Sequence, residues 1–184
     1  ITIIHIRAFQ QCMQLKNVIF EEESQLKILE NAAFGHGVLE TITLPKLVET
    51  VETYALGTQL KSVFVDEENP FLCSVDGVLY SKDKTKLILY PSQKEDEEYV
   101  ILDTVKTIQS IAIEKNNFLK KIVFPKDMEV IDAFHPIIFQ CEKLEEITIP
   151  ASVTFIGAGA FRNCVELKSV ILENPENWCI SSDI

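Results

Sequence analysis

Residues 150–172 read PASVTFIGAGAFRNCVELKSVIL, and this order of residue types returns along the rest of the chain. A proline is followed by Val and Ile three residues apart, then by Ala and an aromatic residue, then by Cys and a Leu-x-x-Val-x-Leu segment. Five other segments follow the same order: residues 1–20, 26–44, 45–65, 105–124 and 128–149. We interpret the chain as about six copies of one repeat, with the sixth slightly stretched near His135.

The leucine that opens the last segment of each repeat sets the period. These leucines lie 21 to 25 residues apart, with a single gap of 59: Leu15, Leu39, Leu60, Leu119, Leu144 and Leu167. Leucine-rich repeats have periods of about 20–29 residues, so the long gap fits one repeat plus an insertion. Because no repeat can bury its apolar face alone, such units stack.

The sequence therefore predicts a single right-handed leucine-rich repeat solenoid over residues 1–184. Its short parallel strands are expected on a concave face, with turns and short helices or 3-10 segments outside. The aromatic residue after each Ala is expected to point inward, which predicts an interior row of Phe9, Phe34 and Phe161. Ile1 enters in mid-repeat, which predicts that the chain is part of a longer protein.

The insertion, near residues 66–100, has a different pattern. Asp76 and Gly77 lie between apolar runs, which is a strong signal for a tight hairpin. A second antiparallel pairing is expected between residues 78–80 and 87–90, followed by an acidic return loop. We expect the hairpin to loop out, so that the strands on either side of it, which carry Phe64 and Val123, become neighbours.

Composition excludes several classes of partner. Hydrophobic residues make up 47% and charged residues 24%, which is typical of globular proteins. The net charge of −11, with no cluster of Lys and Arg, disfavours nucleic acid and anionic membrane surfaces. No apolar run approaches the roughly 20 residues that span a bilayer, so no direct membrane insertion is expected.

No catalytic, metal-binding or cofactor motif stands out. His5, His36 and His135 occupy non-equivalent repeat positions, and the acidic runs lack the order of a calcium loop. Cys12, Cys141 and Cys164 share one repeat position, which is typical of small buried side chains; a Cys141–Cys164 disulfide stays open as an alternative. We predict that the chain is not an enzyme and carries no metal or cofactor.

The repeat resembles the BspA-like leucine-rich repeat family of cell-surface and secreted proteins. Residues 150–172 match that family's repeat closely, and its hairpin insertion is matched by Asn69-Pro70, residues 76–80 and residues 87–91. The resemblance implies a surface-exposed or secreted, non-enzymatic adhesion module that binds a protein or extracellular-matrix ligand. One alternative is a structural spacer that presents other domains of a larger protein. Another is a repeat scaffold attached to an enzyme whose catalytic part lies elsewhere.

A binding face follows from the strand pattern. Residues between the inward Leu and Ile positions point outward, and several of them are large and apolar. An exposed apolar patch often marks an interaction surface, although strand propensity alone also favours such residues. The predicted face comprises a central row and a polar rim: Ile19, Thr43, Phe64, Val123, Thr148 and Ile171, with Lys121 and Glu146.

Overall fold

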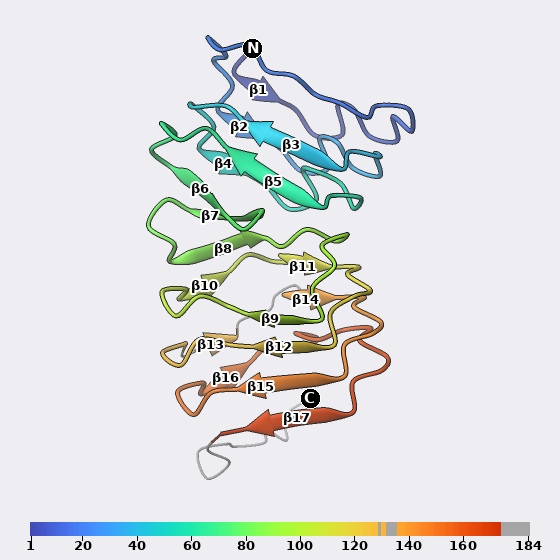
Figure 1. The fold of residues 1–184 in the computed structure, drawn as a ribbon, viewed down its shortest axis with the longest axis vertical. Helices are drawn as coiled ribbons and strands as arrows, with labels where there is room; N and C mark the ends of the chain where they lie inside the picture. Colours follow the sequence, from blue (N-terminus) through green and yellow to red (C-terminus); the bar gives the residue numbers. More distant parts are fainter. Residues whose placement is uncertain (129, 132–135, 174–184) are drawn as a thin grey trace.

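The structure, a computed structural model, describes residues 1–128, 130–131 and 136–173. These residues form a stack of coils along the long axis of the molecule (Figure 1), with each repeat contributing one coil. The leucine-rich repeat solenoid expected from the sequence is confirmed. The stretch near His135, where we expected extra residues, lies outside the described ranges.

The Leu-x-x-Ile-x-Leu segments form the longest strands of the repeats, which we call the long-strand face. In residues 41–44 and 146–149 the inward residues are buried and the residues between them are not, as period-two alternation requires. In residues 169–172, the last described segment, the inward Val170 is 47% exposed. Pairing is parallel, in a β3–β5 sheet and a β9–β12–β15–β17 sheet. The strands are β3 (Thr41–Leu44), β5 (Ser62–Val65), β9 (Glu98–Val100), β12 (Lys121–Val123), β15 (Glu146–Ile149) and β17 (Ser169–Leu172).

Two further rows of short strands complete the coils. The Val-x-x-Ile step, which we expected to be only a turn, contributes two residues of parallel strand in most coils: β1 (Ile3–Ile4), β2 (Ile28–Leu29), β4 (Thr50–Val51), β10 (Thr107–Ile108), β13 (Val130–Ile131) and β16 (Phe155–Ile156). At the outer edge, β11 (Ile113–Glu114) pairs with β14 (Ile138–Phe139), and Tyr90 bridges to Ile113.

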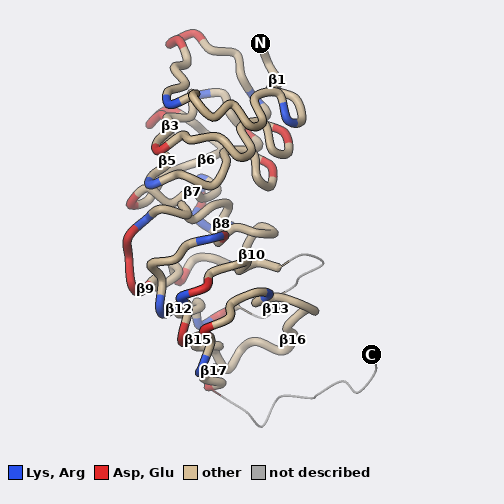
Figure 2. The backbone as a smooth tube through the Cα atoms, turned by 90° about the vertical axis from the view of Figure 1, so that its right-hand side faces the viewer, with Lys and Arg blue, Asp and Glu red and all other residues tan. Residues whose placement is uncertain are grey.

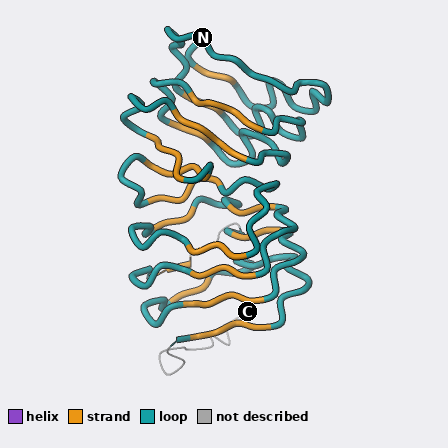
Figure 3. Tube along the Cα trace, viewed as in Figure 1, coloured by secondary structure: helices purple, strands orange, loops and turns teal. Residues whose placement is uncertain are grey.

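The expected helices or 3-10 segments are wrong for the described residues, where only strands, turns and loops occur (Figure 3). Two left-handed residues, three or four positions apart, bend the outer edge of most coils. They have φ between 50° and 79°: Arg7 and Gln11, Ala32 and His36, Tyr54 and Gly57, Ile111 and Lys115, Gly159 and Asn163. Left-handed residues interrupt the run of angles that a helix needs. The freed N–H groups bond to the next coil instead, as Phe34 does to the Ala55 carbonyl.

The insertion forms an antiparallel meander. Strand β6 (Leu72–Val75) pairs with β7 (Val78–Ser81) around Asp76 and Gly77, and β7 pairs with β8 (Lys86–Leu89). Strand β8 then pairs in parallel with β10, which joins the meander to the next coil. The acidic segment between Lys94 and β9 runs along the side of the stack (Figure 2).

The meander lies inside the stack and does not loop out, so our expectation on its place is wrong. Side chains of β7 and of the middle of β8 are buried on both faces and alternate between two hydrophobic cores. Leu72, Leu79 and Ile88 join the core of the first coils, whereas Val78, Tyr80, Leu87 and Tyr90 join the core of the later ones. A strand that is apolar on both faces must be covered on both faces. The meander therefore lies between the two hydrophobic cores and separates them.

Two buried asparagines tie neighbouring coils together. The Asn69 side-chain amide donates to the Pro45 and Val48 carbonyls of the preceding coil, at 3.0 and 2.8 Å. Its oxygen accepts the backbone N–H groups of Phe71 and Leu72, both at 2.8 Å. All the bonding capacity that a buried amide brings is thus used within the protein.

Asn116, which follows the insertion in the sequence, makes the same four kinds of hydrogen bond. Its amide donates to the Pro91 and Lys94 carbonyls at 3.2 and 2.8 Å, and its oxygen accepts from Phe118 and Leu119. An Asn-x-Phe-Leu tetrapeptide occurs at both places in the sequence, and this signal was missed.

The aromatic row is interior only in part. Phe34 is buried and stacks on Phe9 with ring centroids 5.2 Å apart. Phe9 itself is 42% exposed, and Phe161 is half-buried against Phe124. Both lie in the outermost described coils, which have a stacked neighbour on one side only among the described residues.

Candidate functional site

The long-strand face carries the residues predicted to bind a partner, in two separate patches. In the β9–β12–β15–β17 sheet, Val123 lies opposite Thr148, which lies opposite Ile171. Lys121 lies opposite Glu146 on the same sheet, with Lys121 Nζ 3.2 Å from a Glu146 carboxylate oxygen.

The second patch belongs to the first coils. Thr43 lies opposite Phe64 in the β3–β5 sheet, and both are exposed. Ile19 is 89% exposed but lies outside any strand. The first coil therefore presents its outward residue from a loop.

Val100 was missed by the sequence reasoning because β9 was assigned to the end of the insertion. It lies opposite Val123 and is 59% exposed. The row on the later coils thus begins with Val100 and runs through Val123 and Thr148 to Ile171. Glu98 lies opposite Lys121 and extends the polar rim, with 3.6 Å between Lys121 Nζ and the Glu98 carboxylate.

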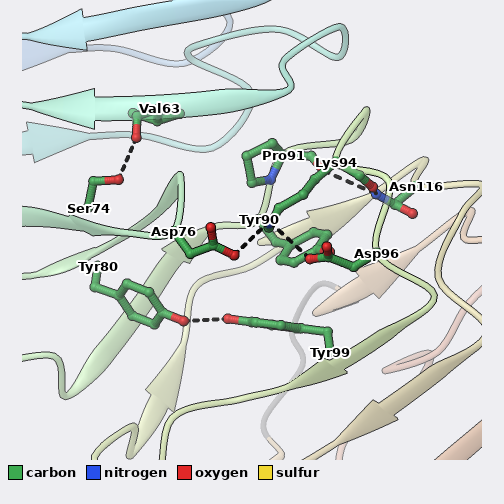
Figure 4. Close-up of polar contacts among 10 residues, drawn as sticks. All are labelled: Val63, Ser74, Asp76, Tyr80, Tyr90, Pro91, Lys94, Asp96, Tyr99 and Asn116. Atoms are coloured by element: carbon green, nitrogen blue, oxygen red, sulfur yellow. Dashed lines mark hydrogen bonds and ion pairs between the residues drawn. The ribbon is translucent and has the colours of Figure 1, made fainter.

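Phe64 and Val123 are not neighbours, and our expectation that they form one centre is wrong. Strand β12 pairs with β9 and β15, whereas β5 contacts the tip of the meander. The Val63 N–H donates to the Gly77 carbonyl at 2.9 Å, and Ser74 Oγ donates to the Val63 carbonyl at 2.6 Å (Figure 4). The meander tip separates the two patches.

A tyrosine cluster holds the meander against the later coils (Figure 4). The Tyr80 and Tyr99 hydroxyls share a hydrogen bond of 2.5 Å, and the rings of Tyr99 and Tyr90 lie 4.4 Å apart. Tyr90 donates its hydroxyl hydrogen to Asp96 at 2.9 Å. Burial raises the pKa of all three hydroxyls above the usual range, so the tyrosines stay neutral and act as structural donors.

Lys94 adds charge to this junction. Its ammonium lies 2.8 Å from Asp76 at the meander tip and 3.1 Å from Asp96, and its side chain is largely buried. A partly buried cation between two carboxylates orders the tip and the segment before β9 together. The junction is therefore a structural clamp rather than a set of free reactive groups.

A hollow opens on the outer edge, where the first coils approach the later ones. It is about 300 Å³ in volume, with Arg7, Asn31 and Tyr54 on one side and Glu114 and Phe139 on the other. Glu114 is a buried carboxylate, with the Lys115 ammonium at 3.5 Å. No sequence motif marked it.

The repeats also match a known family by sequence. A sequence profile for the BspA type leucine-rich repeat region matches residues 1–76 and 92–180, in six copies. The chain belongs to the BspA-type leucine-rich repeat family. The internal stretch that the profile leaves unmatched, residues 77–91, includes β7 and β8 of the meander, which departs from the BspA-type coil.

Solved structures of three bacterial proteins share the BspA-type stack. The pneumococcal vaccine antigen PcpA is 34% identical, with a TM-score of 0.77 over 92% of this chain and 48% of that one. A leucine-rich repeat protein from Eubacterium ventriosum is 28% identical, with a TM-score of 0.73 over 85% and 42%. A leucine rich cell surface protein from Faecalibacterium prausnitzii shares the fold, at 22% identity and a TM-score of 0.59 over 99% and 58%. The chain thus spans about half the length of these proteins, and comparison with curated proteins finds no significant match.

Reactive groups are dispersed over the BspA-type coils. No three His, Cys, Asp or Glu side chains gather as a metal site within the described ranges, which leave out His135. The four described cysteines are free: Cys141 and Cys164 are buried as predicted, whereas Cys12 is exposed in the first coil. Burial raises the pKa of the Cys141 thiol to about 12, so it is an inert apolar side chain. Within the same ranges, no helix is long and apolar enough to cross a membrane.

Glu114 is expected to lower the stability of the BspA-type stack at neutral pH. Burial raises the pKa of its carboxyl, and Lys115 opposes this shift only in part. The native state therefore holds the Glu114 proton more tightly than the unfolded chain, and this contribution to stability is lost as pH rises through the native pKa. We expect Glu114→Gln to raise the free energy of unfolding at pH 7 by on the order of 1 kcal/mol.

Urea unfolding of both proteins at pH 7 and at pH 4 checks this expectation. The gain should shrink at the lower pH, where Glu114 of the parent protein is itself largely protonated. An equal change at both pH values would show that the carboxylate charge is not the cause.

Proposed function

We propose that the chain is a recognition module of a surface-exposed or secreted protein, and that it binds a protein or extracellular-matrix partner without catalysis. One observation supports this most: Val100, Val123, Thr148 and Ile171 lie in register on four paired strands and face outward. Two of them, Val100 and Ile171, are 59% and 42% exposed. Side chains in such a row need no apolar neighbour for the fold, so the apolar character of Val100, Val123 and Ile171 favours an interface.

The polar rim suits this role. Lys121 lies between Glu98 and Glu146, so the row of apolar residues is bordered by a ladder of alternating charge. Interfaces are usually anchored by a few central apolar or aromatic residues, and rim charges act mainly on orientation and association rate. The names of the similar structures, a vaccine antigen and a cell surface protein, favour a place on the cell surface.

Within this proposal, the patch on the later coils is the primary contact. It joins four strands, whereas Thr43 and Phe64 join two and are separated from it by the meander tip. Ile19, Thr43 and Phe64 extend the contact only for a partner large enough to pass over the tip.

Replacing Val100 and Val123 together by Ser is expected to weaken partner binding by about tenfold or more, because the apolar anchor is lost. Binding is measured by surface plasmon resonance against a panel of purified extracellular-matrix proteins. The free energy of unfolding should change by no more than about 1 kcal/mol, since neither side chain lies in the core.

Val165→Ser is the matched control. Val165 is 74% exposed and lies in a turn, away from the strands of the long-strand face, so its loss should leave binding unchanged. Unaltered binding by the double variant, with loss of binding on substitution of Asp76, would make the meander the recognition element. Absence of binding to any matrix protein would favour the spacer alternative.

A further inference from the structure

The hollow at the outer edge has a polar lining that the fold leaves incompletely used. A second, smaller hollow of about 20 Å³ shares Tyr54, Thr58 and Glu114 with the larger one and reaches Ser92. Ser92 is 5% exposed, and its Oγ has no hydrogen-bond partner among the described residues. Buried hydroxyls are nearly always bonded, so this one calls for a partner from outside the chain.

Glu114, which lines both hollows, also has unused hydrogen-bonding capacity. Its carboxylate is buried in the wall common to both hollows, and the only ion pair it makes within the described ranges is with Lys115 at 3.5 Å. A carboxylate accepts up to about four hydrogen bonds, and burial makes each missing one costly. Glu114 is thus a strong acceptor with capacity left over.

The charges around the hollow argue for a neutral ligand. Arg7 and Lys115 would repel a cation, whereas Glu114 would repel an anion. Hydroxyl groups both donate and accept, so they can donate to Glu114, bond to Ser92 and accept from Arg7 and Lys115. Tyr54 and Phe139 also line the larger hollow, and their aromatic rings can cover the apolar faces of a ring-shaped ligand.

We propose that this hollow binds a small neutral saccharide, with Glu114 and Ser92 accepting or exchanging hydrogen bonds with its hydroxyls and Tyr54 and Phe139 flanking its ring. The volume of about 300 Å³ lies at the lower end of small-molecule sites, which suits one or two sugar units. The smaller hollow, which Ser92 lines, has room for one hydroxyl group. This site is separate from the long-strand face and does not depend on its role.

The proposal is tested by NMR titration of the ¹⁵N-labelled chain with glucose, galactose, mannose and N-acetylglucosamine. At least one sugar should cause saturable shifts of amides around Tyr54, Ser92 and Glu114 in the millimolar range. Agmatine and inorganic phosphate serve as cationic and anionic probes and should bind more weakly at these residues.

Glu114→Gln should weaken sugar binding by roughly ten- to hundredfold, since hydrogen bonds to a charged acceptor are the strong ones. This variant is expected to fold at least as well as the parent, so lost binding cannot be ascribed to lost structure. Glu166→Gln is the matched control, because Glu166 pairs with Lys143 in another part of the stack and should leave affinity unchanged.

Three outcomes overturn the proposal. The first is that no sugar in the panel causes a saturable shift at tens of millimolar. The second is binding that Glu114→Gln leaves intact. The third is that agmatine or phosphate binds these residues more tightly than every sugar, which would assign the hollow to a charged ligand.

Discussion

Asn116→Ala is expected to lower the free energy of unfolding by about 3–5 kcal/mol, because it leaves several backbone groups unpaired in the interior. The Asn116 amide serves two carbonyls of the preceding coil and two N–H groups of its own turn, and it is fully buried. Alanine supplies none of these bonds and leaves a cavity where water cannot readily replace the amide. Urea unfolding followed by circular dichroism measures the loss.

Asn117→Ala is the matched control, since Asn117 is adjacent but exposed and, among the described residues, accepts one long bond of 3.3 Å from the Glu142 N–H. It should change stability by less than about 1 kcal/mol. Asn116→Asp keeps the acceptor but loses both donors and buries a charge, so it should be about as harmful as alanine. If Asn116→Ala is nearly as stable as the parent protein, the four hydrogen bonds of the Asn116 side chain are dispensable.

Phe34→Ala is expected to cost a similar amount, about 3–5 kcal/mol, because it removes a fully buried aromatic side chain. Phe34 packs in the core of the first coils and stacks on Phe9. The interior row expected from the repeat, which includes Phe161, implies the same cost for Phe161→Ala. The structure lowers that expectation to about 1–3 kcal/mol, since Phe161 is only half-buried.

Comparison of Phe34→Ala with Phe161→Ala and Phe9→Ala by denaturant unfolding checks this order. Equal losses at all three positions would show that the outer coils are as well covered as the inner one. A loss at Phe34 below about 1 kcal/mol would contradict its place in the core.

The repeat pattern is sufficient to predict the coil and the order of its segments. Each period of 21 to 25 residues has one strand with Leu and Ile at alternate positions, and only stacking can bury that side of the strand. The local sequence was sufficient to predict this stacking, because each strand residue lies beside the equivalent residue of the next coil. The inward positions of Leu60, Leu119 and Leu144 followed directly from the pattern, and all three are buried.

The outer edge could not be derived this way. Its turns hold Tyr54, Ile111 and Lys115 in left-handed conformations. These residue types rarely adopt such conformations, so the sequence does not predict them. Such angles are maintained by hydrogen bonds to the adjacent coil, which exist only after stacking. The expected helices are absent for that reason among the described residues.

Tertiary structure alone decided where the insertion lies and what it brings together. The Asp76–Gly77 turn is local and readable, but the alternation of Val78, Leu79 and Tyr80 between two cores depends on coils that lie before and after it. The separation of Phe64 from Val123 depends on those same coils. So does the approach of Glu114 to Tyr54, 60 residues away in sequence, across one hollow. A repeat pattern predicts the contacts that all neighbouring coils have in common. A site between two unlike coils depends instead on how the whole stack packs.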